Sequence, residues 1–254
     1  MDFFELVSNW INVNYRIESL IKTLQTIQHQ GAMAGTLTPT KNSNVFIQEV
    51  PATTKPSLNI EDGEIQWSHG ALSGAWGTTR CQAILQYALP LAKDGSYPPI
   101  LIKIRVNATI KLKPKNEFKN IKDFTPLYKM LLHDYGGDKA GFCAAMGTRT
   151  ISEYNNFGTV EGVLYHELLH FALAKVFAKQ LQRQLLGKIS GGSYETREKA
   201  IAAFSEAADE TWKGWRGLLL HDASFLDERF IWEKECAYYI KQYEEAGKPG
   251  LSTG

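Results

Sequence analysis

The stretch from residue 160 to residue 177, VEGVLYHELLHFALAKVF, constrains the fold more than any other part of the chain. Its apolar side chains cover most of the circumference of a helix, so this helix is suited to burial. His166, Glu167 and His170 are embedded in it. Residues four apart lie on the same helix face, so the two imidazoles can converge on one point, with Glu167 beside them. Burying these groups without partners would cost several kcal/mol.

A divalent metal ion is a suitable partner for these three side chains. Zinc is held in proteins by neutral imidazole nitrogens, and a catalytic zinc keeps a bound water on which a nearby carboxylate can act. The spacing therefore predicts a zinc site in which His166 and His170 are ligands and Glu167 stays free to act on the water. The alternative is a buried histidine pair bonded to backbone carbonyls, with Glu167 in an ion pair.

On these residues, HELLH on a long apolar helix, the chain resembles the zincin class of zinc metallopeptidases. The resemblance covers this helix alone. It implies that His166 and His170 ligate zinc and that Glu167 is the general base. Metzincins continue the motif with a glycine and a third histidine, which residues 171–175 lack. The pattern is closer to that of gluzincins, in which a later helix supplies a glutamate.

The third ligand is expected on the last helix of the chain. In EKECA, Glu233 is followed by Cys236 and Ala237, a small surface that would let this helix approach the HELLH helix closely. Glu233 is therefore the predicted ligand, and Glu235, followed by two tyrosines, is the runner-up. The remaining alternatives are His221 and Asp227 as ligands, and Asp222 or Asp227 as a carboxylate behind a ligand.

The fold class expected from the pattern is α+β. Period-two alternation predicts strands at 45–50, 64–68, 80–89 and 100–113, and three-to-four spacing predicts helices at 124–137, from 160 to about 186, from beyond 193 to about 220, and at 227–245. We expect a zincin-like arrangement in which an antiparallel or mixed sheet in the N-terminal half packs on the HELLH helix. Two further long helices follow it.

The N-terminal segment divides the chain into three expected parts. Residues 1–30 form a helix whose apolar residues, between 3 and 27, repeat three and four apart. It either packs on its own domain or docks a partner or a second copy of the chain. Residues 31–43 are small, polar and turn-rich, as in a flexible linker. Residues 44–254 are then the zincin-like domain.

Composition excludes several classes of protein. With 254 residues and 44% hydrophobic content the chain can bury one sizeable core. A net charge of +1 provides no overall field toward nucleic acid or an anionic membrane. Cys81, Cys143 and Cys236 are odd in number and contain no CxxC pair, which argues against a disulfide framework and a cysteine zinc site.

The N-terminal sequence MDFFELVSNW lacks the basic start of a secretory signal, and no run is long enough to span a bilayer. We therefore expect synthesis in the cytoplasm and, if the protein is exported, a secretion system that needs no cleaved signal.

Residues 144–154, AAMGTRTISEY, have strand character just before the HELLH helix. In zincins a strand at the sheet edge beside that helix holds the substrate as an extra strand. The resemblance thus makes Gly147, Thr148, Arg149 and Thr150 candidate substrate contacts, the alternative being an ordinary interior strand. Donors for the oxyanion of the reaction are expected among His221, Tyr238 and Tyr239.

Two functions follow from these features. The first is a zinc metallopeptidase in which Glu167 takes a proton from the bound water and returns it to the leaving amine. The detachable N-terminal helix suggests a bacterial toxin or effector. The second is a non-catalytic module that keeps a zincin scaffold and binds a partner through its N-terminal helix. A purely structural metal site has no use for Glu167, so its presence favours the enzyme.

Overall fold

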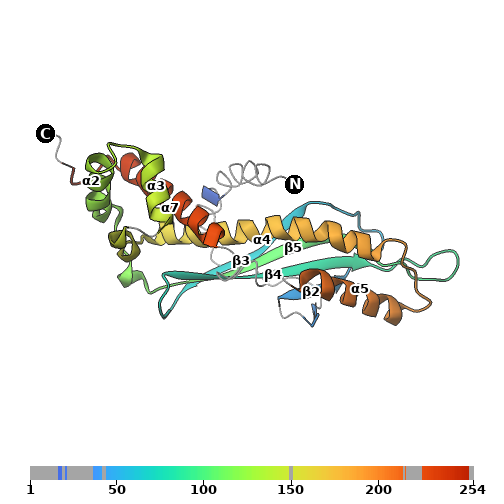
Figure 1. Cartoon of the computed structure of the whole chain (residues 1–254). Helices are drawn as coiled ribbons and strands as arrows, with labels where there is room; N and C mark the ends of the chain where they lie inside the picture. Colours follow the sequence, from blue (N-terminus) through green and yellow to red (C-terminus); the bar gives the residue numbers. More distant parts are fainter. Residues whose placement is uncertain are drawn as a thin grey trace.

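Two long antiparallel strands, β4 (Gly77–Ala88) and β5 (Ile100–Leu112), form the centre of the sheet (Figure 1). This computed structural model describes residues 17–18, 21, 37–41, 44–148, 151–213, 215 and 225–251, without the side chains of 225–227. The other described strands are β1 (Thr38–Pro39), β2 (Val45–Glu49) and β3 (Ile60–His69). The order β1-β2-β4-β5-β3 includes two parallel pairs, β2 with β4 and β3 with β5, so the sheet is mixed.

The alternating sequence of β5 separates a buried face from a polar face. Ile104, Val106 and the following alternate residues to Leu112 are at most 2% exposed. On the other face, Lys103 Nζ and Arg105 Nε lie 2.9 and 3.3 Å from carboxylate oxygens of Glu61 on β3. The half-buried strand predicted from the alternation is confirmed, and part of its basic face is neutralised by the neighbouring strand.

Five helices are described, and α4 (Val160–Ile189) is the longest. It lies along the sheet, with α5 (Arg197–Trp212) near its C-terminal half and α7 (Phe225–Glu245) near its N-terminal half (Figure 1). The short helices α2 (Thr125–His133) and α3 (Lys139–Gly147) lie at the same end as α7 (Figure 1). The fold is thus α+β, as expected, with a mixed sheet and two long helices after the HELLH helix.

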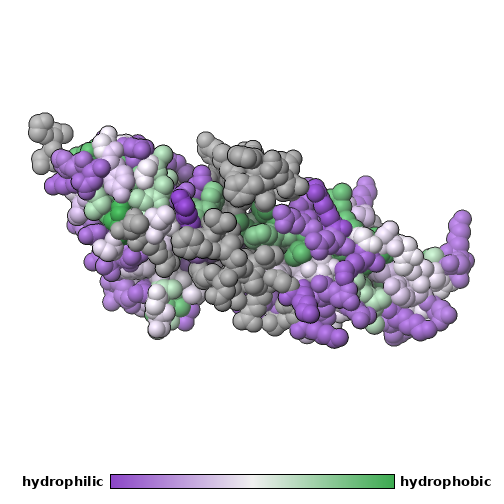
Figure 2. Space-filling view, in the orientation of Figure 1, coloured by the Kyte–Doolittle hydropathy of each residue, from purple (hydrophilic) through white to green (hydrophobic). Residues whose placement is uncertain are grey.

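Separate apolar clusters hold the two ends of the elongated molecule. At one end, α5 packs on the sheet and on the second half of α4, where Phe204 stacks on Tyr87 with ring centroids 4.7 Å apart. At the other end, α2, α3 and α7 share a cluster centred on Phe124 and Tyr243. On the face shown in Figure 2, hydrophilic residues predominate at both ends and apolar residues gather near the middle. The helix α4 runs between the two clusters and joins them.

The described residues of the N-terminal segment pack on the domain itself. Ile17 and Ile21 are 1% and 3% exposed and join the cluster formed by the first half of α4, β5 and Ile231 of α7. Glu18 accepts hydrogen bonds from Lys241 of α7 at 2.8 and 2.7 Å. Most of the predicted helix, 1–30, lies outside the described residues, so docking of a partner through it stays a prediction. Among the described helices, none has the length and apolar content that crossing a membrane requires.

Several predicted elements differ in extent from the observed ones. The strand expected at 64–68 is the second half of β3, whose first half carries acidic residues and Gly63 and so lacks the apolar alternation. The end of the predicted linker, Thr38–Pro39, is the edge strand β1, paired antiparallel with β2. The strands expected at 45–50, 80–89 and 100–113 are confirmed.

The strand predicted at 144–154 is wrong. Residues 139–147 form α3, and Ser152–Asn156 form a 3-10 helix, while 149 and 150 lie outside the described part of the chain. Asp138 caps α3, because its side chain accepts hydrogen bonds from the backbone of Ala140 and Gly141. This cap, together with three good helix formers at 144–146, outweighs the weak alternation that suggested a strand.

We expect Phe204→Ala to lower the free energy of unfolding by about 3–5 kcal/mol, because it leaves a cavity against Tyr87 in a fully buried position. Glu206→Ala, on the exposed side of the same helix, should change it by less than about 0.5 kcal/mol. Urea unfolding of both variants measures the difference. Equal losses would contradict the packing of α5 on the sheet.

Candidate metal centre

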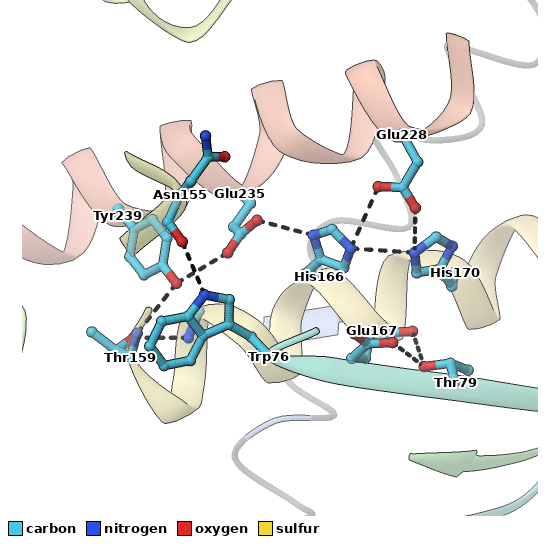
Figure 3. A network of polar contacts seen from close by, with 11 residues as sticks. Trp76, Thr79, Asn155, Thr159, His166, Glu167, His170, Glu228, Glu235 and Tyr239 are labelled. Atoms are coloured by element: carbon cyan, nitrogen blue, oxygen red, sulfur yellow. Dashed lines mark hydrogen bonds and ion pairs between the residues drawn. The ribbon is translucent and has the colours of Figure 1, made fainter. Parts of the chain in front are cut away.

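The side chains of His166, His170 and Glu228 converge between α4 and α7 (Figure 3). The Nε2 atoms of the two histidines lie 3.2 Å apart. Glu228 Oε1 lies 3.1 Å from His170 Nε2, and Oε2 lies 3.8 Å from His166 Nε2. One ligand atom from each residue falls within 4.8 Å of the others. The arrangement brings one carboxylate and two imidazoles to a common point.

These separations fit a tetrahedral metal ion. Nitrogen and oxygen ligands about 2.1 Å from zinc lie about 3.4 Å from one another in tetrahedral geometry. The separations of 3.2 Å between the two Nε2 atoms and 3.1 Å between His170 Nε2 and Glu228 Oε1 are close to that value, and the other Glu228 oxygen, Oε2, lies 3.8 Å from His166 Nε2. All three residues are also nearly excluded from water, with side-chain exposures of 11%, 14% and 12%. The three residues are therefore suited to hold a metal ion of this size and preference.

A second carboxylate orients His166 from the opposite side of its ring. The Nδ1 atom of His166 lies 2.9 Å from Glu235 Oε2, so Nε2 is the atom turned toward His170 and Glu228 (Figure 3). The Tyr239 hydroxyl donates to Glu235 Oε1 at 3.0 Å, and it accepts a hydrogen bond from the backbone N–H of Thr159 at 3.3 Å. A buried chain of hydrogen bonds thus runs from the ring of His166 to the start of α4.

The start of α4 is shaped to receive Tyr239. Thr159 caps the helix, as predicted, by accepting a hydrogen bond from Gly162 N at 3.0 Å. A Cβ atom at Gly162 would overlap the ring of Tyr239. The glycine therefore provides the space in which the tyrosine reaches Glu235 and Thr159.

Charges around the site favour protonated groups when no metal is present. Burial by itself would lower the pKa of His166, but the carboxylates of Glu235, Glu167 and Glu228 outweigh it and raise that pKa to about 9. Burial, followed by the charge of Glu235, raises the pKa of Tyr239 well above its usual value. The Tyr239 hydroxyl therefore keeps its proton and serves as a donor to Glu235.

Glu167 faces the sheet rather than α7. The Thr79 hydroxyl, on β4, donates to Glu167 Oε2 at 2.6 Å, and the glutamate is only 4% exposed (Figure 3). Its other oxygen lies against Gly77, where a Cβ atom would come within 2.5 Å of Oε1. Strand β4 thus holds one oxygen of this carboxylate through Thr79, and the missing side chain of Gly77 gives the other oxygen its space.

The structure does not bring Glu233 to the histidines. Its carboxylate accepts a hydrogen bond from Arg229 Nε at 3.1 Å, one turn earlier on α7. Glu233 lies five positions after Glu228, which places the two side chains on different faces of the helix. The small surface assigned to Cys236 and Ala237 does not face α4 either, because Cys236 belongs to the cluster with α2 and α3 and Ala237 is exposed. The runner-up, Glu235, lies behind His166 instead of in the cluster.

Sequence analysis missed Glu228, although a signal was present. Glu228 and Glu235 are seven residues apart, so they lie on the same face of α7, and this face meets the two histidines. The HELLH helix needs both a ligand and a carboxylate behind a ligand. A search for two acids at that spacing on one later helix would have identified the pair.

The other predicted site residues lie elsewhere or outside the description. Tyr238 stacks on Tyr165 with centroids 4.3 Å apart, and it is the neighbouring Tyr239 that bonds to Glu235. Gly147 and Thr148 form the end of helix α3. Their prediction as substrate contacts assumed a strand at these two positions, which the structure does not have. Outside the described residues lie Arg149, Thr150, His221, Asp222 and the side chain of Asp227.

We expect Tyr239→Phe to lower the free energy of unfolding by about 1–3 kcal/mol, because it removes the donor to Glu235 Oε1 and the acceptor for the Thr159 N–H in a buried position. Tyr238→Phe is the matched control. Its hydroxyl accepts a hydrogen bond from Gln242 in a partly exposed position, so the loss should stay below about 1 kcal/mol. Urea unfolding measures both, and the reverse ranking would refute the role given to Tyr239.

Comparisons with protein-family models, with curated proteins and with solved structures find no match for this chain. The chemistry of the site therefore rests on its own residues: two histidines and a glutamate that can hold a metal ion, an acid that orients one histidine, and a second acid held by the sheet.

Proposed function

We propose that this protein is a zinc-dependent metallopeptidase of the zincin type, which hydrolyses peptide bonds. The observation that carries the proposal is the convergence of His166, His170 and Glu228 at the spacing of tetrahedral ligands, with Glu167 one residue from a ligand. Two imidazoles and one carboxylate are a common ligand set of catalytic zinc, and the fourth position then holds water or substrate.

The chain supplies the remaining parts of a hydrolytic site. A bound zinc ion would lower the pKa of a ligated water and polarise the scissile carbonyl. In this proposal Glu167, the residue that follows the ligand His166, would accept a proton from that water and pass it to the leaving amine. The Thr79 hydroxyl holds one oxygen of Glu167, so the other is the oxygen that handles the proton. Glu235 and Tyr239 keep the ring of His166 in its ligating orientation.

The edge of strand β4 is the part of the sheet along which an extended peptide could bind. Residues 83–87 of β4 pair with β2, whereas residues 77–82 pair with β5 and with no other strand among those described. An exposed strand edge can bind a peptide through main-chain hydrogen bonds. This edge carries Gly77 and Thr79, which contact Glu167. We therefore place the substrate along residues 77–82 in place of the 147–150 segment.

The non-catalytic alternative is less well supported. In a module that only binds a partner, the buried carboxylate of Glu167 would have no role. Both of its oxygens contact strand β4, one at Thr79 and the other at Gly77. The described N-terminal residues Ile17 and Ile21 are already buried against the domain. Action as an exported effector or toxin remains a prediction from the sequence.

The metal ligands can be tested by zinc content. We expect the purified chain to hold one zinc ion and Glu228→Ala to bind it more than about 100-fold more weakly, because loss of a ligand exceeds the about 10–100-fold effect of losing a carboxylate behind one. Glu233→Ala, on the same helix but paired with Arg229, should bind zinc as the parent does. Competition with a chelating dye measures all three. If Glu233→Ala loses zinc and Glu228→Ala keeps it, Glu228 is not the third metal ligand.

Hydrolysis is tested separately from metal binding. We expect Glu167→Gln to keep its zinc and to lose about 10²–10⁴-fold in peptide cleavage, the usual contribution of a general base. Glu206→Gln, exposed on α5, should cleave as the parent does. Products from a mixed peptide library are followed by mass spectrometry. A variant at Glu167 that cleaves at the parent rate would overturn the assignment of the general base.

A further inference from the structure

Helices α3 and α7 touch along a line that includes two of the three cysteines. A Cβ atom built at Gly147 would lie 2.7 Å from Glu233 Cγ and 2.8 Å from Arg229 O, so the two backbones approach closely there. Cys143 lies one turn before Gly147 on α3, and Cys236 lies about one turn after Glu233 on α7. The two cysteines therefore face the same line of contact.

The two thiols lie opposite each other across the α3–α7 contact. The helices run antiparallel, because Gly147 of α3 meets Arg229 and Glu233 of α7 while Lys139 pairs with Glu244 at 2.7 Å, so Cys143, midway along α3, lies opposite Cys236. Both are free thiols in one apolar cluster, and they are 8% and 0% exposed. A disulfide needs Cα atoms about 4.4–6.8 Å apart, a separation that only closely packed elements provide. Antiparallel helices that approach closely at a glycine can bring two facing cysteines into this range.

We propose that Cys143 and Cys236 form a reversible disulfide that crosslinks α3 to α7 when the protein meets a peroxide. This modification site lies outside the proposed metal centre, and its formation does not depend on the proposed function. Sequence separation hid it, because the two cysteines belong to no short motif.

The oxidation balances with peroxide as the oxidant. The Cys143 sulfur attacks one peroxide oxygen, so an S–O bond forms, the O–O bond breaks, and the departing oxygen leaves as water with one thiol proton. The Cys236 sulfur then attacks the Cys143 sulfur. The S–S bond forms, the S–O bond breaks, and a second water leaves with the other proton. Two thiols are oxidised and one peroxide is reduced to two waters.

The surroundings of the pair decide the order of the two steps. Hydrogen bonding from Cys236 lowers the pKa of the Cys143 thiol, against the opposing effect of burial. The same hydrogen bond, together with burial, raises the pKa of the Cys236 thiol. Cys143 is also the more exposed of the two, so it is the sulfur that meets the oxidant first and Cys236 is the one that resolves it.

The crosslink would restrain the helix that carries Glu228 and Glu235. It joins α7, immediately after Glu235, to α3, so relative movement of the two helices would be limited. Closing a long loop also restricts the unfolded chain, which raises the unfolding temperature. The oxidised protein is therefore more resistant to heat, and if the proposed zinc site is present it releases zinc more slowly.

The test uses the full chain and its third cysteine as an internal control. Cys81, on β4, is 5% exposed, and burial raises the pKa of its thiol to about 12, so it should not react. After treatment with hydrogen peroxide we expect the intact mass to fall by the two hydrogens of one disulfide. Peptide mapping should find Cys143 joined to Cys236, with Cys81 free for alkylation, and dithiothreitol should reverse the change.

Variants separate the crosslink from general damage. Cys143→Ala and Cys236→Ala should lose the mass change and the rise in unfolding temperature, roughly 5 °C or more, whereas Cys81→Ala should keep both. A disulfide that includes Cys81, sulfinic acid at Cys143 without a crosslink, or three thiols that remain free would each overturn the proposal. If the crosslink forms in a protein that binds no zinc, the crosslink supports the disulfide proposal. The missing zinc then counts against the proposed metal site and not against the disulfide.

Discussion

The contact between His166 Nδ1 and Glu235 Oε2, across the interface of α4 and α7, is the interaction on which the rest of the site depends. An unpaired carboxylate or imidazolium in this interface would be costly to bury, so each helix needs the other. The contact also gives the two nitrogens of the imidazole different partners. With Nδ1 held by Glu235, Nε2 points toward His170 and Glu228, and these three side chains could together hold a metal ion.

Two acids on α7, seven positions apart, contact the two nitrogens of His166. A helix that crosses α4 presents residues seven apart on one face, and Glu228 and Glu235 use this spacing to meet His166 on opposite sides of its ring. Tyr239, one turn beyond Glu235, continues the same face and returns to the start of α4 at Thr159. The two helices are thus joined by polar contacts at successive turns, so a rotation of α7 about its axis would break several of them together.

Sequence alone predicted the local features of this arrangement and failed on those that depend on tertiary position. The HELLH helix, its cap at Thr159 and the alternating strand β5 follow from short-range patterns, and each is confirmed. The choice of Glu233 failed because it assumed which face of α7 meets α4, and small neighbours do not determine this. The strand at 144–154 failed because a helix cap and helix-forming residues outweighed a weak alternation. Cys143 and Cys236 share one apolar cluster although they come from distant segments, so no local sequence pattern could bring them together.

Strand β4 gives the buried acid Glu167 two different kinds of support. The Thr79 hydroxyl donates a hydrogen bond to one of its oxygens, and Gly77, which has no side chain, leaves the space that the other oxygen occupies. The edge of the same strand has a different character, because β2 begins to pair with β4 only at Ala83 and residues 77–82 have no second strand partner among the described residues. On the proposed function, one backbone segment would therefore hold Glu167 through its face and a peptide along its edge, which would fix the position of the peptide relative to that acid.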